Sequence, residues 1–260
     1  MRLFHLHWGN VKEMEQYPAH HIEVSETRYG DIHTRASSSA QPTVSISSGI
    51  SEIDEALGGL YIGQITSFIG RSKLLSSLLH RVCVNTFDMF HSPTVVLDSG
   101  NQLNPFLLAR FAHLNMIPPQ DLLEQVYLSR AYTVYQLTDL VHAHVESLIQ
   151  QKKPVTVILT GLCSLLGDAD VSDEAASQLL QLWIKKMKQI TQTYPVAIII
   201  IDKQDLRSDM VLLDELVDTM IHVKDMRHCP RITIVQKNQR VTVTSETIGQ
   251  LCLQDFGMVI

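Results

Sequence analysis

The sequence predicts an α/β protein with a doubly wound, mostly parallel sheet and a β-rich hairpin region at its C-terminal end. Three observations predict this fold. Apolar segments with the length of strands alternate with helical segments between residues 64 and 202. The segment 196–202 contains four consecutive isoleucines, which is typical of a central strand covered by helices on both faces. Beyond residue 219 only short strand-like segments follow, and these predict the hairpin region.

The individual elements follow from local signals. Residues 51–57 predict a short helix, in which Ser51 caps the start and Gly58 with Gly59 ends it. Longer helices are expected where apolar residues recur every three or four positions: 73–90, 105–114, 134–151 and 174–193. Strands are expected where short apolar runs are bounded by turn residues: 64–69, 94–97, 126–129, 155–159, 196–202, 220–224, 231–236 and 241–245.

Composition limits the organisation of the chain. Its 260 residues are 45% hydrophobic, which suffices for one well-buried domain, and 18% charged, which argues against a disordered protein. Residues 1–42 are poor in aliphatic side chains, and their last part, residues 36–42, reads as a flexible linker. The sequence therefore predicts an N-terminal extension over residues 1–42 and a core domain over residues 43–260.

Charge and cysteine usage narrow the class of protein. The net charge is −6, whereas proteins that bind nucleic acid by themselves usually carry a basic excess. The four cysteines form no C-x-x-C pair, which favours reduced, buried thiols. No apolar run has the length of a membrane span, and the N-terminus has no apolar signal core. We therefore expect a soluble, cytoplasmic protein with no membrane association.

The most informative segment joins the first core strand to the helix after it. Residues 47–70 read SSGISEIDEALGGLYIGQITSFIG and continue as Gly70-Arg71-Ser72-Lys73-Leu74. This entry resembles the ATPase core of RecA/RadA-type recombinases, in which the same strand runs into the phosphate-binding loop G-x-x-x-x-G-K-[ST]. Here the glycine-rich middle of that loop is missing, and Leu74 stands where the family has a hydroxyl residue.

Further segments carry the resemblance in the same order along the chain. Residues 96–101 (VLDSGN) are similar to the family's strand that ends in Asp-Thr-Glu. Residues 125–132 (QVYLSRAY) resemble its next strand and turn, and residues 157–164 (VILTGLCS) resemble the Walker B strand. Residues 196–204 are similar to the strand that leads into the second DNA-binding loop. The resemblance covers residues 43–260 and implies the RecA-like P-loop NTPase fold.

The chemistry of that family needs groups that this sequence lacks. A phosphate-binding loop uses consecutive backbone N–H groups, a lysine and a hydroxyl ligand of Mg²⁺. The remnant here is Gly70, Arg71, Ser72, Lys73 and Leu74. We expect it to be non-functional as a cofactor site, with Lys73 solvated at the start of a helix and Ser72 as its N-cap.

Two acidic positions are also replaced. The Walker B carboxylate corresponds to Thr160, and the family's catalytic glutamate corresponds to Gly100. Asp98 is retained, but a strand-end aspartate is more often a cap or turn residue. We therefore predict no catalytic residue, no metal site and no cofactor, with ATP and Mg²⁺ as the alternative.

The segments at the positions of the DNA-contacting loops depart from the family as well. Residues 167–174 carry four acids and no base, so they would repel phosphate, or they serve as an acidic helix start. Residues 203–214 are mixed in charge. The family's polymerisation motif Phe-x-x-Ala is absent from residues 33–47. His142 and His144 stand two apart on an expected helix, so they point away from each other.

The resemblance implies a non-catalytic recombinase paralogue in DNA recombination and repair. Its expected partners are other RecA/RadA-type proteins or repair factors, with weak or indirect association with DNA. One alternative is an atypical ATPase that uses Lys73, Asp98 and residues of a partner. The other alternative is a scaffold or signalling adaptor unrelated to DNA.

Overall fold

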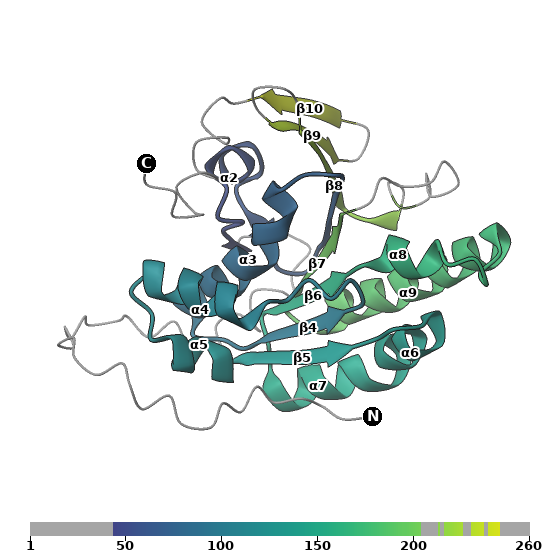
Figure 1. The fold of residues 1–260 in the computed structure, drawn as a ribbon, viewed down its shortest axis with the longest axis horizontal. Helices are drawn as coiled ribbons and strands as arrows, with labels where there is room; N and C mark the ends of the chain where they lie inside the picture. Colours follow the sequence, from purple (N-terminus) through teal and green to yellow (C-terminus); the bar gives the residue numbers. More distant parts are fainter. Residues whose placement is uncertain (1–43, 204–212, 214–215, 226–229, 237–238, 245–260) are drawn as a thin grey trace.

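The structure is a computed structural model, and it describes residues 44–203, 213, 216–225, 230–236 and 239–244. The predicted extension over residues 1–42 lies outside these residues. The described chain forms one eight-stranded sheet in the order β10-β9-β8-β3-β7-β6-β4-β5, with helices on both faces (Figure 1). A two-stranded antiparallel pair, β1-β2, precedes this sheet. None of the described helices is both long and apolar enough to cross a membrane.

The strands have the following bounds: β1 Ser45–Ile46, β2 Leu60–Tyr61, β3 Ile65–Ile69, β4 Thr94–Asp98, β5 Val126–Arg130, β6 Thr156–Thr160, β7 Ala197–Asp202, β8 Thr219–Asp225, β9 Pro230–Gln236 and β10 Gln239–Thr244. The helices are α2 Ser51–Leu57, α3 Leu74–Phe90, α4 Pro105–Leu114, α5 Pro119–Glu124, α6 Val134–Asp139, the π-helix η1 Leu140–His144, α7 Val145–Lys152, α8 Leu162–Leu166 and α9 Asp173–Thr193.

The sheet has a parallel part and an antiparallel extension. Strands β8, β3, β7, β6, β4 and β5 pair in parallel, so their carboxyl ends meet at one edge. Strand β9 pairs antiparallel with β8, and β10 pairs antiparallel with β9. This arrangement confirms the predicted doubly wound α/β sheet and its C-terminal hairpin region.

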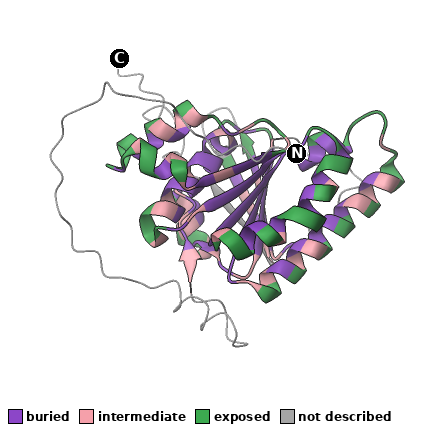
Figure 2. Ribbon diagram, turned by 90° about the horizontal axis from the view of Figure 1, so that it is seen from below, coloured by how far each residue is buried: buried purple, intermediate pink, exposed green. Residues whose placement is uncertain are grey.

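Two hydrophobic layers enclose the sheet. Helices α2 to α5 supply one layer and the helices from α6 to α9 supply the other. Figure 2 shows the buried strands between the helices. The four isoleucines of β7 divide between the layers: Ile199 and Ile201 join the first, and Ile198 and Ile200 join the second. All four are fully buried, which explains why this strand is apolar on both faces.

Local signals were right about most elements and wrong about some of their ends. Gly58 ends α2 in the left-handed conformation, as predicted. The predicted cap Ser51 is wrong, because Ile50 is the N-cap residue and makes no side-chain capping bond. Instead, Asp54 accepts hydrogen bonds from the backbone N–H of Ser48 and the hydroxyl of Ser47, which fixes the entry to this helix.

Other differences concern elements that are short or irregular. The pair β1-β2 and the helices α5 and α8 were not expected, and none of them is longer than six residues. The helix expected over residues 134–151 contains the π-helical turn η1, which brings His144 within 3.1 Å of Asp139, five residues earlier. The wider turn keeps Leu140, Val141 and Val145 buried against α9 and the sheet.

The two described cysteines agree with the expected state. Cys83 and Cys163 are buried thiols that form no disulfide. Burial raises the pKa of the Cys83 thiol to about 12, and it also raises the pKa of the Cys163 thiol, so both are protonated at neutral pH. The other two cysteines, Cys229 and Cys252, lie outside the described residues.

Candidate functional site

The remnant of the phosphate-binding loop lies at the carboxyl edge of the sheet, between β3 and α3. Gly70 follows the last residue of β3, and Leu74 is the first residue of α3, so four residues make the connection. Gly70 has φ +136°, and a Cβ atom there would overlap the carbonyl oxygen of Val223 on β8. The connection therefore runs directly against the neighbouring strand, and only glycine fits at this position.

The first turn of α3 is already occupied by a carboxylate from the same chain. The hydroxyl of Ser72 donates a 2.5 Å hydrogen bond to Oδ1 of Asp225, at the end of β8. The backbone N–H of Lys73 donates to Oδ2 of Asp225 at 3.3 Å. The N–H of Leu74 donates to the hydroxyl of Ser72 at 3.2 Å. A phosphate-binding loop would direct such donors at a ligand, whereas here the Ser72 hydroxyl and the Lys73 N–H are hydrogen-bonded to Asp225.

These contacts settle where the predicted loop residues lie. Ser72 is not the N-cap residue of α3, because Lys73 has that position, although the Ser72 hydroxyl does accept a bond from the helix N-terminus. Arg71 and Lys73 are exposed. Leu74 is 4% exposed and packs in the layer of helices α2 to α5. The residue at the position of the Mg²⁺-binding hydroxyl is therefore part of the hydrophobic core.

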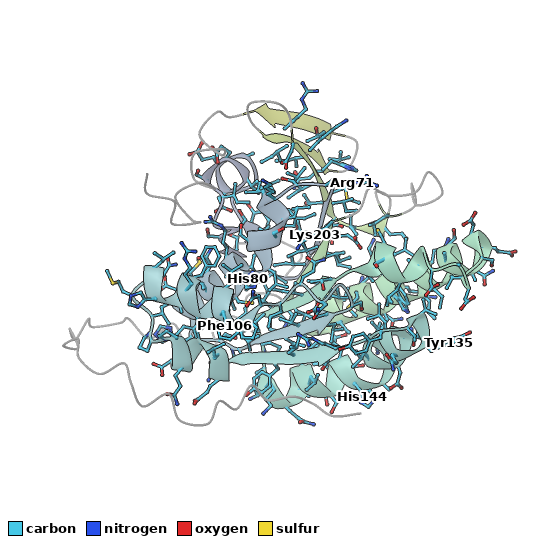
Figure 3. All side chains as sticks on the ribbon, in the orientation of Figure 1. Arg71, His80, Phe106, Tyr135, His144 and Lys203 are labelled. Atoms are coloured by element: carbon cyan, nitrogen blue, oxygen red, sulfur yellow. The ribbon has the colours of Figure 1, made fainter. Side chains whose placement is uncertain are left out.

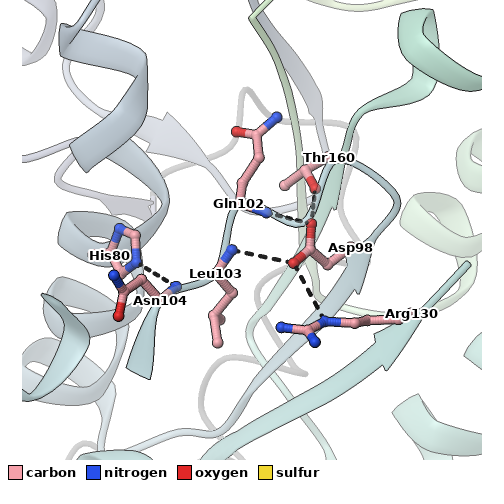
Figure 4. Close-up of polar contacts among 7 residues, drawn as sticks. All are labelled: His80, Asp98, Gln102, Leu103, Asn104, Arg130 and Thr160. Atoms are coloured by element: carbon pink, nitrogen blue, oxygen red, sulfur yellow. Dashed lines mark hydrogen bonds and ion pairs between the residues drawn. The ribbon is translucent and has the colours of Figure 1, made fainter. Parts of the chain in front are cut away.

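Asp98 lies at the carboxyl end of β4 and is 1% exposed. Its Oδ1 accepts hydrogen bonds from the N–H of Gln102 at 2.9 Å and from the hydroxyl of Thr160 at 2.6 Å (Figure 4). Its Oδ2 accepts from the N–H of Leu103 at 3.1 Å, and Nε of Arg130 lies 3.9 Å away. Asp98 is therefore a turn-holding residue, as its position at the end of a strand predicted.

Thr160 occupies the Walker B position beside Asp98. The two residues are direct partners in the register of β6 and β4, so their side chains meet on the same face of the sheet. Thr160 is 1% exposed, and its hydroxyl donates a hydrogen bond to the carboxylate of Asp98. A second carboxylate at the edge, Asp202, accepts a 2.6 Å bond from the N–H of Cys163 and so holds the turn after β6. Both buried acids are thus used for structure.

The glycine at the position of the catalytic glutamate is tightly surrounded. A Cβ atom on Gly100 would lie 2.7 Å from the side-chain nitrogen of Gln102. A Cβ atom on Gly161 would meet the backbone of Gly100 in turn. The turns after β4 and β6 therefore touch backbone to backbone. Among the described residues, no three His, Cys, Asp or Glu side chains are grouped so that they could hold a metal ion.

Two residues near this edge were not predicted from the sequence. His80 on α3 is 1% exposed, and its Nε2 accepts a 3.0 Å bond from the N–H of Asn104. Burial lowers the pKa of His80 to about 4. Lys203 follows β7, and partial burial lowers its pKa while the charge of Asp98 acts in the opposite direction. Figure 3 labels both side chains. Their partners are distant in sequence, so no local pattern could have revealed them.

The segment at the position of the first DNA-contacting loop is exposed and acidic. Asp168, Asp170, Asp173 and Glu174 are all exposed to solvent. Ser172 caps α9 by accepting a bond from the N–H of Ala175, and Asp173 and Glu174 lie in the first helical turn. The interpretation as an acidic helix start is confirmed for these two residues, since negative charge there complements the helix dipole. Most of the second loop region, residues 203–214, lies outside the described residues.

A comparison with protein families agrees with this geometry. A family model described as Rad51 matches residues 39–214, which is more than half of the chain. The chain belongs to the Rad51 family. Membership of the Rad51 family confirms the resemblance to RecA/RadA-type recombinases and the RecA-like fold. No curated protein matches the chain.

The Rad51 family match extends across the remnant loop and the Walker B position. Residues 70–74 and Thr160 all fall within the matched residues 39–214. Strands β3, β4, β5, β6 and β7 fall within them as well, so the parallel strands that carry the site belong to the family domain. Asp225 lies beyond the matched residues, in the part of the sheet that begins the antiparallel extension.

Proposed function

We propose that this chain is a non-catalytic member of the Rad51 family. In this proposal it acts in DNA recombination and repair through contacts with other RecA/RadA-type proteins, and it does not hydrolyse ATP. Family membership supports the link with recombination. The departures from the family's motifs support the absence of catalysis.

One observation carries the proposal: the hydrogen bond from Thr160 to Asp98. In the resembling ATPases the Walker B position holds a carboxylate for Mg²⁺ and its water. Here the hydroxyl of Thr160 at that position donates a hydrogen bond to Oδ1 of Asp98, with the two oxygens 2.6 Å apart inside the protein. Asp98 also accepts hydrogen bonds from the N–H groups of Gln102 and Leu103. If Asp98 became a metal ligand, these buried donors would lose their acceptor, at a cost of about 1–3 kcal/mol each.

Assembly with a related protein is the remaining use of such a core. The resemblance implies that RecA-type cores bind ATP between adjacent subunits. A subunit without its own working site can therefore complete, cap or modulate the site of a neighbour. The exposed acids at Asp168, Asp170, Asp173 and Glu174 disfavour direct contact with a phosphate backbone at this loop, which supports action through protein contacts.

The experiment that tests this function has two arms. In the first, the full chain carrying an affinity tag is isolated from its native host, and the co-purifying proteins are identified by mass spectrometry. Enrichment of RecA/RadA-type proteins or repair factors supports the proposal, whereas their absence together with enrichment of signalling proteins would favour the adaptor alternative. In the second, calorimetry measures ATP binding in the presence of Mg²⁺.

The second arm separates the proposal from the atypical ATPase. An active RecA-type ATPase, measured under the same conditions, serves as the positive control. The Lys73→Ala variant serves as the matched variant, because Lys73 is the retained lysine of the remnant loop. Mg²⁺-dependent ATP binding that Lys73→Ala abolishes would favour the atypical ATPase.

A further inference from the structure

We infer that Asp225 acts as a built-in anion for the N-terminus of α3 and latches β8, the strand to which the antiparallel extension is attached, onto this helix. Where a phosphate-binding loop would accept an external phosphate, this chain supplies its own carboxylate. The inference rests on the proposed function in one respect. A subunit that binds no nucleotide needs another acceptor for the hydrogen-bond donors at the start of α3 and another contact that orders this edge of the sheet.

The contact has the chemistry of an anion site. Ser72 and Lys73 donate to different oxygens of the Asp225 carboxylate, at 2.5 Å and 3.3 Å. Lys73 is the N-cap residue of a helix of 17 residues, so its backbone N–H and the positive end of the helix dipole face that carboxylate. A negative group at this place is favoured for the same reasons that favour phosphate at a helix N-terminus.

The backbone beside this contact is closely fitted. Strands β3 and β8 pair in parallel up to Ile69 and His222, so the chain leaves both strands side by side. Gly70 then lies so close to the Val223 carbonyl that no side chain fits between them. Asp225 is two residues beyond Val223, on the same face of β8. The short connection and the carboxylate therefore meet at one point, and this point joins β8 to α3.

The charges around Asp225 show a local excess of cations. Lys224 and Arg231 are direct cross-strand partners of β8 and β9, and both are exposed. Like charges in that arrangement repel each other. Neither side chain, nor that of exposed Lys73, has an ion-pair partner within the described part of the chain. Lys224 lies on the opposite face of β8 from Asp225, so the latch rests on the contacts with α3 and not on this pair.

The consequence is an edge of the sheet that is ordered without a ligand. In this chain the contact between β8 and α3 is intramolecular, so it forms whenever the core folds. The arrangement of α3, β8 and β9 is then the same with or without nucleotide.

The latch is tested with Asp225→Ala, Asp225→Asn and the control Asp88→Ala in the full chain. Asp88 is exposed near the other end of α3 and makes no ion pair or hydrogen bond within the described part of the chain. We expect Asp225→Ala to lower Tm by about 2–6 °C. Asp225→Asn, which keeps an acceptor oxygen without the charge, should show a smaller loss. Asp88→Ala should leave Tm unchanged or slightly higher.

Hydrogen–deuterium exchange locates the effect. Asp225→Ala should accelerate exchange in the first turn of α3 and in β8 and β9, while β4 and β6 keep the protection of the unmodified protein. If Asp225→Ala matches Asp88→Ala in Tm and in exchange, there is no latch. If exchange rises equally throughout the sheet, Asp225 contributes to global stability only, and the inference is overturned.

Inorganic pyrophosphate tests whether Asp225 stands in for phosphate. Asp225 is exposed, so an external anion can reach its place once the carboxylate is removed. Millimolar pyrophosphate should raise the Tm of Asp225→Ala by at least about 1 °C and leave the unmodified protein unchanged. No response in Asp225→Ala would refute the role as a phosphate surrogate. Mg²⁺-dependent ATP binding by the unmodified protein would instead refute the proposed function, and the Tm comparison of the variants would still decide on the latch.

Discussion

Thr160 donates a hydrogen bond to Asp98 across two adjacent parallel strands, and the oxygens lie 2.6 Å apart in a site closed to solvent. The donor stands at the Walker B position and the acceptor at the end of the strand that precedes the family's catalytic glutamate. Both positions contribute to the stability of the sheet edge. Variants here are therefore expected to change stability.

Thr160→Val removes the hydroxyl and keeps the shape of the side chain. We expect the free energy of unfolding to fall by about 1–3 kcal/mol, because Oδ1 of the buried Asp98 loses its hydrogen bond from the hydroxyl and keeps only the one from the N–H of Gln102. Urea unfolding followed by circular dichroism measures this change. Thr193→Val is the matched control: it removes a hydroxyl that bonds Gln189 on the exposed end of α9, and should change stability by no more than about 0.5 kcal/mol. Equal effects in both variants would contradict the structural role of the Thr160 hydroxyl.

The second prediction concerns nucleotide. Calorimetry with ATP and Mg²⁺ should give no measurable binding, because Ser72 and Lys73 donate to Asp225 and the connection between β3 and α3 has only four residues. Lys73→Ala should alter the free energy of unfolding by less than about 0.5 kcal/mol, since the Lys73 side chain is exposed. A dissociation constant below about 10 μM, equivalent to roughly −7 kcal/mol, would contradict this prediction.

The third prediction concerns DNA. We expect weak binding of single-stranded DNA without sequence preference, as the net charge of −6 and the acids at the start of α9 repel phosphate. Fluorescence anisotropy at several salt concentrations measures the affinity and its salt dependence. Neutralising Asp168 and Asp170 to asparagine should strengthen binding, whereas the same change at exposed Asp121 on α5 should have less effect. Nanomolar affinity of the unmodified protein at physiological salt would reveal a basic groove.

The fourth prediction concerns pH. His80 has a pKa of about 4 in the folded protein, below its ordinary value of 6.5, because it is buried. Between these two values the unfolded chain binds a proton that the folded chain does not bind. The free energy of unfolding therefore decreases as the pH falls from 6.5 to 4, by roughly 3 kcal/mol at most, and this contribution stays constant above pH 6.5.

Two substitutions isolate that contribution. His80→Gln keeps an acceptor for the N–H of Asn104 but cannot titrate, so its stability should decline less steeply between pH 6.5 and 4 than that of the unmodified protein. His142→Gln, on the exposed side of the π-helix, should retain the slope of the unmodified protein. Parallel slopes for all three proteins would show that His80 titrates normally.

The fifth prediction concerns the N-terminal extension. The described core begins with β1 at Ser45, so removing residues 1–42 leaves every described element in place. We expect the truncated chain to fold, as judged by circular dichroism and its Tm, and to lose capture of the RecA/RadA-type partner. The extension carries the apolar residues Leu3, Phe4, Leu6 and Trp8, and we expect Phe4 and Trp8 to anchor the contact. Full capture by the truncated chain would place the interface on the core instead.

The parallel sheet could be predicted because its signals are local. Each central strand is a short run of apolar residues, and the strand with Ile198, Ile199, Ile200 and Ile201 needs an apolar layer on either side, which the structure provides. The role of Asp98 as a turn residue could also be predicted, since its backbone partners Gln102 and Leu103 follow within five residues.

The latch could not be predicted for the opposite reason. Ser72 and Asp225 are 153 positions apart, and neither lies in a motif that points to the other. Their meeting depends on β8 pairing beside β3, a choice of strand order that hydrophobic patterns do not encode. The same holds for His80 and Asn104, which come together through the packing of α3 against α4.

Leu74 carries a consequence for the evolution of this chain. Its side chain is buried in the core, so a change to serine or threonine would leave a cavity and cost roughly 2–4 kcal/mol. That cost would come at once, whereas a hydroxyl at position 74 can bind a metal only after Thr160 and the short connection have also changed. A change at position 74 toward the family's motif is therefore harmful when it occurs alone, and it brings no gain until the other changes are present.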